Sequence, residues 1–203
     1  MITYKIHLLR CAGTEQRQRG FYVGQQDFPI CETGRDALIE FSQRFEYPQV
    51  DMVLTSPLLR CTQTADILYP DVYTEQMSEL RDLCLGEFEG KTPDRLADNP
   101  AFEAWLKNSL ENTPPGGEGL QDFALRVTGA LESIFTRMMQ ESIANIAVIT
   151  HAGVIMTLLA SAGIPRLAPQ EWLSENGCGF TLLMSAQMWM RSRCGEVFER
   201  IPK

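Results

Sequence analysis

The sequence predicts an α/β domain with a mainly parallel central sheet. Apolar, strand-like runs alternate with helical patterns along the chain, which is typical of this fold class. The run at 143–150 (IANIAVIT) is apolar almost throughout, as expected for a central parallel strand buried on both faces. The chain has 203 residues, of which 44% are hydrophobic, so one globular domain with a substantial core is expected.

The expected elements alternate in chain order. Apolar residues at helical spacing predict helices at 34–45 and 154–162, and the longest apolar face predicts one at 118–140. Thr-Ser-Pro before 58–68 is a helix-start signal, with Pro57 in the first turn. The remaining expected elements are strands at 4–9 and 50–54, short helices within 93–110, loops at 11–29 and 113–117, and a final hairpin from 180–190 and 195–201.

Composition narrows the function class. The net charge of −8 argues against nucleic-acid or anionic-membrane partners, because both need a basic surface. No segment reaches the roughly 20 apolar residues of a membrane span, and the N-terminus lacks a signal-peptide pattern, so we expect a cytoplasmic location. The six cysteines show no C-x-x-C spacing, which favours small buried apolar residues over disulfides or structural zinc. We expect no cofactor and no metal.

Three polar side chains fall at the predicted carboxyl ends of strands. Arg10 and His151 directly follow strands, and Arg60 lies in the first turn of the helix after another. Ligands bind at this edge of parallel sheets. Two guanidiniums and an imidazole there, with the helix N-terminus after Pro57, would make an oxyanion site. Taken singly, each has a plainer interpretation as a surface charge or a hydrogen-bonded core residue.

Six local strings stand out along the chain: LLRCAGTE at 8–15, GFYVGQQD at 20–27, TSPLLRCTQTA at 55–65, LRDLCLGEFEG at 80–90, GGE at 116–118 and ITHAGVI at 149–155. In this order they resemble the motifs of the histidine phosphatase (phosphoglycerate mutase-like) superfamily. Six matches in the right order over positions 8 to 155 are too many to arise by chance.

The resemblance implies a three-layer α/β/α fold, a single domain over 1–203 with 91–117 as a cap segment, and phosphatase chemistry. In that family a histidine attacks phosphorus, arginines and a second histidine hold the phosphoryl oxygens, and a glutamate protonates the leaving group. By position, phosphate would be bound by Arg10, Arg17, Arg60 and His151, while Cys11 stands at the nucleophile and Asp82 at the acid. The implied partner is a small phosphorylated metabolite or free phosphate. Substrate identity and oligomeric state stay open.

Several departures from the family pattern fall in this one pocket. Cys11 replaces the nucleophilic histidine, Asp82 replaces glutamate, Ala12 replaces glycine, and Arg17 stands where many members carry asparagine. A thiol reaches less far than an imidazole, and misplacement by roughly 1 Å can cost about a hundredfold in rate. A thiolate beside Arg and His is nevertheless a strong nucleophile.

These changes leave two hypotheses. One is a divergent phosphomonoesterase that works through Cys11 or direct water attack; the other is a phosphate-binding pseudoenzyme acting as sensor or partner protein. A phosphoglycerate mutase is disfavoured, since it needs a lasting phosphoenzyme and 90–116 is short for a water-excluding lid. An engineered His-to-Cys replacement is a further interpretation, although the accompanying changes indicate natural divergence.

Other candidate residues have weaker patterns. Cys11 and Arg17 fit the C-x5-R spacing of cysteine-dependent phosphatases, but Cys194 and Arg200 fit it too, so the pattern carries little weight. His7, on the first strand, is expected to pack or hydrogen-bond within the sheet. Glu87 and Glu89 could substitute for Asp82, although their family position predicts structural or solvated side chains.

Overall fold

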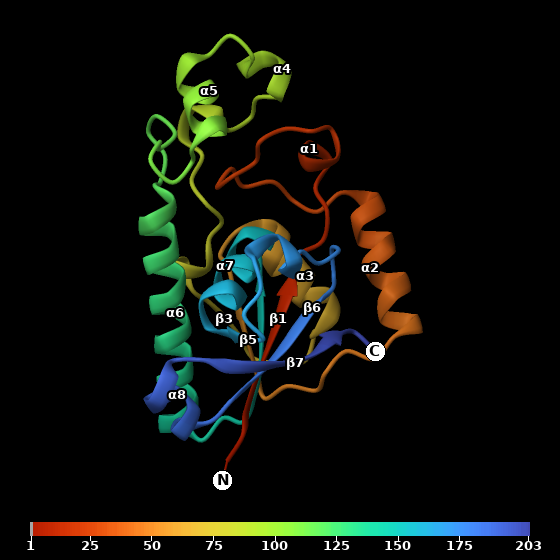
Figure 1. The fold of residues 1–203 in the computed structure, drawn as a ribbon. Helices are drawn as coiled ribbons and strands as arrows, with labels where there is room; N and C mark the ends of the chain where they lie inside the picture. The colour runs from red at the N-terminus through yellow and green to blue at the C-terminus, as the bar shows by residue number, and fades with distance from the viewer. Residues whose placement is uncertain (1) are drawn as a thin grey trace.

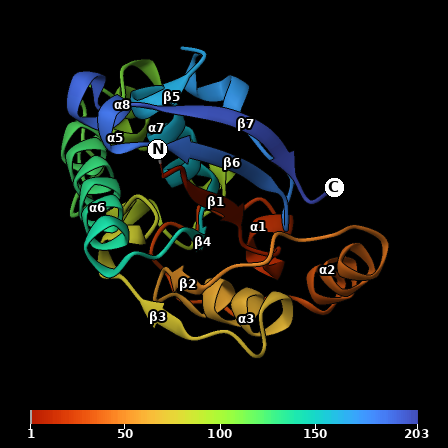
Figure 2. The same ribbon diagram turned by 90° about the horizontal axis from the view of Figure 1, so that it is seen from below.

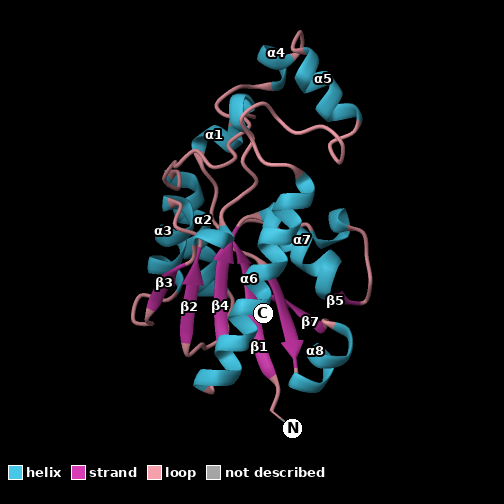
Figure 3. Cartoon of the chain, turned by 90° about the vertical axis from the view of Figure 1, so that its left-hand side faces the viewer, coloured by secondary structure: helices cyan, strands magenta, loops and turns pink. Residues whose placement is uncertain are grey.

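The computed structural model describes residues 2–203, which form a seven-stranded sheet in the order β3-β2-β4-β1-β6-β7-β5 (Figures 1 and 3). β1, β2, β3 and β4 pair in parallel, whereas β6 runs antiparallel to both β1 and β7. The strands are β1 (Tyr4–Arg10), β2 (Met52–Thr55), β3 (Thr74–Gln76), β4 (Asn145–Thr150), β5 (Gly163–Ile164), β6 (Gly179–Met184) and β7 (Gly195–Ile201).

Helices cover both faces of this sheet, with α6 and α7 on one side and α2 and α3 on the other (Figure 2). The predicted three-layer α/β/α fold with a mainly parallel sheet is confirmed. The helices are α1 (Glu15–Gln18), α2 (Glu32–Arg44), α3 (Leu59–Leu68), α4 (Pro93–Leu96), α5 (Pro100–Lys107), α6 (Leu120–Glu141), α7 (Ala152–Ala162) and α8 (Ala186–Ser192), with 3-10 turns at Ser78–Leu80, Gly86–Phe88 and Pro169–Trp172.

The central strands divide their side chains between two cores. Successive side chains of a strand point to opposite faces, so Leu8 and Val148 join the larger core under α6 and α7. Leu9 and Ile149 join the smaller core under α3. Burial on both faces explains why the predicted run at 143–150 is almost entirely apolar, and β4 lies between β2 and β1.

Several boundary predictions were wrong. The segment 180–190 is not one strand: β6 ends at Met184 and α8 follows, because the Ser185 hydroxyl accepts from the Met188 amide as an N-cap. Trp189 of α8 packs against Phe135 of α6, with ring centroids 5.5 Å apart, which a strand would not allow. β6 and β7 still pair antiparallel, as the predicted hairpin requires.

Elsewhere the differences are smaller. The loop 11–29 contains α1, which Thr14 caps by accepting from the Arg17 amide. Pro57 precedes the N-cap residue of α3 and does not lie in the first turn. The short strands β3 and β5 have too few residues for a periodic pattern, so the sequence did not predict them.

α4 and α5 lie beyond the carboxyl ends of the parallel strands (Figures 1 and 3). An aromatic cluster holds them there: Tyr22 and Phe88, from two other segments, pack edge-on against Phe102 at centroid distances of 5.5 and 5.3 Å. Trp105 stacks on Phe102 at 6.0 Å. Such pairs contribute roughly 0.5–1.5 kcal/mol each beyond the area they bury. Leu96 of α4 joins the same cluster, so α4 and α5 belong to a third hydrophobic cluster above the sheet.

His7 lies within the sheet, as predicted, where it is 3% exposed and its Nδ1 is 2.9 Å from the Thr181 hydroxyl. Burial, aided by the nearby charge of Lys5, lowers the pKa of His7 to about 4. Within residues 2–203, no helix is long and apolar enough to cross a membrane.

The low pKa of His7 makes stability depend on pH. The unfolded chain takes up a proton near pH 6.5 and the folded chain only near pH 4, so stability present above pH 6.5 is lost as pH falls toward 4. Between pH 7 and 4, the wild type should therefore lose about 2–3 kcal/mol more unfolding free energy than His7→Gln. Urea unfolding of both proteins across this pH range measures the difference. If the unfolding free energies of the two proteins fall equally with pH, the prediction is wrong.

Candidate active site

The carboxyl ends of β1, β2 and β4 meet at one cavity of about 810 Å³. Arg10 ends β1, Cys11 follows it, and His151 follows β4 as the N-cap residue of α7. Arg60 lies in the first turn of α3, just after β2. The structure therefore brings together the residues that the sequence placed at strand ends, and all four line the cavity, as does Asp82.

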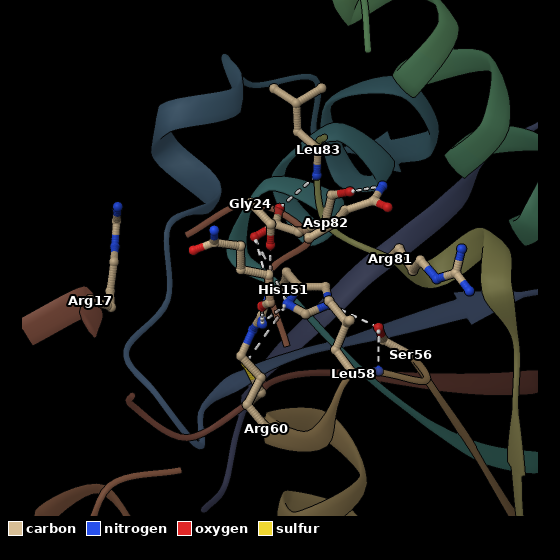
Figure 4. A network of polar contacts seen from close by, with 12 residues as sticks. Arg17, Gly24, Ser56, Leu58, Arg60, Arg81, Asp82, Leu83 and His151 are labelled. Atoms are coloured by element: carbon tan, nitrogen blue, oxygen red, sulfur yellow. Dashed lines mark hydrogen bonds and ion pairs between the residues drawn. The ribbon is translucent and has the colours of Figure 1, made fainter. Parts of the chain in front are cut away.

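Arg60 is the most buried cation at this site, at 4% exposed. Its Nη1 and Nη2 atoms donate to the carbonyls of Gln26 and Gly24 at 2.9 and 2.8 Å, and its Nε donates to Nδ1 of His151 at 3.2 Å. Nη2 also lies 3.9 Å from Oδ2 of Asp82. Gly24 has φ +55°, which favours glycine and turns its carbonyl to the guanidinium. The loop after α1 is thereby tied to α3 (Figure 4).

His151 is held from two sides. Its Nε2 lies 2.9 Å from the Ser56 hydroxyl, while Nδ1 accepts from Arg60. These partners fit the neutral tautomer with the proton on Nε2. Nδ1 also lies 3.9 Å from Oδ2 of Asp82, so the face of the ring nearer the carboxylate presents an acceptor nitrogen.

Cys11 lies beside a second thiol. Its Sγ is 3.9 Å from Nδ1 of His151, and Cys61, the residue after Arg60, is 3.6 Å from Nε2 of the same ring. A hydrogen bond from Cys61, together with the charge of Arg60, lowers the pKa of the Cys11 thiol well below its usual range, against the opposing effect of burial. Burial and the neighbouring Cys11 raise the pKa of Cys61.

The backbone around Cys11 is fixed by side chains from other segments. The amide of Ala12 donates to the Thr64 hydroxyl at 3.0 Å, and Asn176 donates to the Cys11 carbonyl at 2.6 Å. Arg10 donates to the Ser174 carbonyl at 2.5 Å, which orients its guanidinium along the cavity wall. The predicted site thus rests on the segment 174–176, which the sequence had not singled out.

Arg17 has a different setting. It lies on α1, is exposed, and lines the cavity, but it stands apart from the hydrogen-bonded network (Figure 4). At the N-terminus of α3, predicted to offer backbone donors to an anion, two amides already have partners: the Leu59 amide donates to Asp27 at 2.6 Å and the Leu58 amide to Ser56 at 3.4 Å.

Asp82 is held in place through its backbone by Arg126 of α6. The Arg126 guanidinium donates to the carbonyls of Glu79, Arg81 and Asp82 at 2.7, 3.0 and 3.3 Å. Its other edge forms a bidentate pair with Glu118 at 2.8 and 2.7 Å. Glu118 belongs to the Gly-Gly-Glu string, so that motif acts here by orienting Arg126, which the sequence did not indicate.

The alternative carboxylates behave as predicted. Glu89 accepts from the amides of Gln25 and Leu85 at 2.8 and 2.9 Å, which makes it structural. Glu87 is exposed and does not line the cavity. Asp82 is the carboxylate that faces the cavity beside Arg60 and His151.

Comparison with known proteins agrees with this geometry. The model of the histidine phosphatase superfamily, branch 1, matches residues 6–190. The chain belongs to that superfamily. The predicted resemblance, made from motifs over 8–155, is thus confirmed.

The relatives of this family member include phosphatases. Adenosylcobalamin/alpha-ribazole phosphatase of Escherichia coli K12 is 27% identical over 180 residues, covering 86% of this chain and 87% of that protein. A broad-specificity phosphatase of Saccharomyces cerevisiae is 27% identical over 165 residues, covering 76% and 68%. The alpha-ribazole phosphatase of Shigella flexneri has a similar fold, with a TM-score of 0.79 at 21% identity, over 98% of this chain and 96% of that one.

Replacing Arg126 should destabilise the protein. Arg126→Ala leaves three carbonyls and the Glu118 carboxylate without their donor, so we expect a loss of about 3 kcal/mol in unfolding free energy. Arg137→Ala, on the same helix, breaks only half-exposed ion pairs with Glu75 and Glu141 and should cost less than about 1 kcal/mol. Chemical denaturation of the two variants compares them; equal losses would refute a specific role for Arg126.

Proposed function

We propose that this protein hydrolyses a phosphate monoester of a small metabolite, with Arg10, Arg60 and His151 binding the phosphoryl group. The observation that supports this most is the convergence of these cationic and imidazole side chains with Cys11 and Asp82 on one cavity wall. Guanidiniums suit phosphoryl oxygens because their donors match them in geometry and charge. Membership of a superfamily with phosphatase relatives supports the same reaction class.

In this proposal Cys11 is the nucleophile. Its sulfur attacks phosphorus, the bond from phosphorus to the ester oxygen breaks, and Asp82 in its acid form protonates the departing oxygen. Water then attacks the phosphocysteine and gives a proton to the Asp82 carboxylate, the sulfur–phosphorus bond breaks, and phosphate, the thiolate and the acid form of Asp82 result. The lowered pKa of Cys11 favours the thiolate that the first step requires.

The walls of the cavity suggest the class of substrate. Beyond the polar cluster, apolar and aromatic side chains line it, among them Tyr22, Leu83, Trp105 and Phe123. The cavity of about 810 Å³ is large enough for a metabolite beyond the phosphoryl group itself. An alcohol portion with an apolar or aromatic surface fits these walls better than a highly charged one.

A second candidate is a phosphate-binding protein without turnover. Cys11 is only 6% exposed, and it packs with apolar residues of the smaller core. If its sulfur cannot reach phosphorus from there, the cavity still offers Arg10 and His151 to an anion. Both candidates bind phosphate at the same site, but only the first hydrolyses the ester.

Hydrolysis of an aryl phosphate distinguishes them. The wild type should turn it over, and Cys11→Ala should lose at least about a hundredfold in kcat, because the nucleophile is gone. Cys178→Ala is the matched control, since Cys178 is a half-buried thiol outside the cavity and should leave the rate unchanged. Cys11→His tests whether the pocket accepts the family's nucleophile, and it should remain active. Equal rates for wild type and Cys11→Ala would remove Cys11 from the mechanism.

Phosphate binding is tested separately by thermal unfolding. Phosphate at about a hundred times its Kd should stabilise the fold by about 2.7 kcal/mol, or roughly 5–10 °C in Tm for a chain of this size. Arg10→Ala should abolish most of this increment, whatever it does to the Tm without phosphate. Arg44→Ala, an exposed arginine on α2, should retain it. If phosphate still raises the Tm of Arg10→Ala, phosphate binds elsewhere. If phosphate raises the Tm of the wild type but the aryl phosphate is not hydrolysed, the second candidate is favoured.

A further inference from the structure

Three side chains with metal-ligating atoms lie together at the base of the cavity. They are Cys11 after β1, Cys61 in the first turn of α3, and His151 at the start of α7. Their ligand atoms all lie within 4.8 Å of one another, and all three residues are buried. No pair of them is close in sequence, which is why the cysteine spacing gave no sign of the cluster.

The separations suit a single small ion. Nδ1 of His151 is 3.9 Å from the sulfur of Cys11 and 3.9 Å from that of Cys61. Zinc bonds of about 2.3 Å to sulfur and 2.0 Å to nitrogen, at tetrahedral angles, put sulfur and nitrogen about 3.5 Å apart and two sulfurs about 3.8 Å apart. The two nitrogen-to-sulfur separations exceed the first of these values by about 0.4 Å, and the ligand atoms of all three residues lie within 4.8 Å of one another. The sulfur of Cys61 is also 3.6 Å from Nε2, so it must move toward the Nδ1 side of the ring to share one ion with Cys11.

The imidazole is already arranged as a ligand. The Nε2 proton goes to Ser56 at 2.9 Å, which leaves the lone pair on Nδ1. A hydrogen bond from the far nitrogen commonly fixes the tautomer and ring angle of metal-binding histidines. Arg60 now donates its Nε to Nδ1 at 3.2 Å, so an ion bound to Nδ1 requires this guanidinium to give up that bond and move away from the ring.

The charges also balance. Two thiolates and one neutral imidazole around a divalent ion make a neutral group, so coordination adds no net charge beside the buried Arg60. Thiolate and imidazole together select soft or borderline ions such as Zn²⁺ and disfavour Mg²⁺ and Ca²⁺, which need oxygen ligands.

We propose that Cys11, Cys61 and His151 form a binding site for one thiophilic metal ion such as Zn²⁺, with its fourth position open toward the cavity lined by Arg10 and Asp82. This site goes beyond the proposed hydrolysis and does not rest on it. Cys11 has two exclusive uses, because a sulfur bound to the ion cannot attack phosphorus.

Metal binding is measured on the full chain, reduced with a phosphine that does not chelate. Zn²⁺ titrated against a chromophoric chelator should bind at one ion per chain. Co²⁺ in its place should give a thiolate-to-cobalt charge-transfer band, which reports sulfur ligation without any reference to turnover. Cys11→Ser and Cys61→Ser should each weaken Zn²⁺ by at least about a hundredfold and remove about half of the band.

Matched variants separate this site from chance binding by thiols. Cys178→Ser and Cys31→Ser change cysteines outside the cluster and should leave affinity and band unchanged. Ser56→Ala removes only the partner of Nε2 and should weaken Zn²⁺ by roughly 10–100-fold. Since Cys61 is fully buried, each variant's Tm is recorded, and Cys11→Ser at the cavity wall decides the case if Cys61→Ser does not fold.

The proposal is overturned by no Zn²⁺ binding in the wild type, or by binding that survives Cys11→Ser. A full charge-transfer band in folded Cys61→Ser overturns it as well. Zinc binding without hydrolysis supports the metal site and counts only against the proposed function. Hydrolysis without zinc binding supports the proposed function and overturns the metal site.

Discussion

The burial of one guanidinium organises this site. Arg60 is almost fully enclosed, and a charge in such a place is tolerated only when its donors are satisfied. The carbonyls of Gly24 and Gln26, the imidazole of His151 and the nearby carboxylate of Asp82 meet that need. The same contacts join the loop after α1, the start of α3, the end of β4 and the segment before α4, so the geometry of the cavity follows from solvating Arg60.

Around this centre, the strand ends supply reactive groups and other elements hold them still. Arg126 on α6 fixes the backbone that carries Asp82, and Glu118 fixes Arg126. Asn176 holds the carbonyl of Cys11. Sites built on strand ends with such support keep reacting atoms close to a productive arrangement, which agrees with the proposed binding of a phosphoryl group.

The proposed functions of this protein differ in the role that they give to Cys11. Its thiol has a lowered pKa, as an activated nucleophile does, and it packs in the smaller core. It also lies with Cys61 and His151 in a cluster of possible metal ligands. Each use draws on a different property of sulfur: nucleophilicity, small apolar volume and affinity for soft ions. The proposed uses of Cys11 therefore compete for one sulfur atom.

Hydrophobic periodicity and local motifs were sufficient to predict the three-layer fold, the main strands and helices, and the meeting of Arg10, Arg60 and His151, since parallel strands end at one edge. Local signals failed where contacts cross the chain. α8 depends on Trp189 reaching α6. Only the tertiary structure decided that Cys61 lies against Cys11, because residues fifty apart in sequence become neighbours through sheet order, which no local pattern encodes.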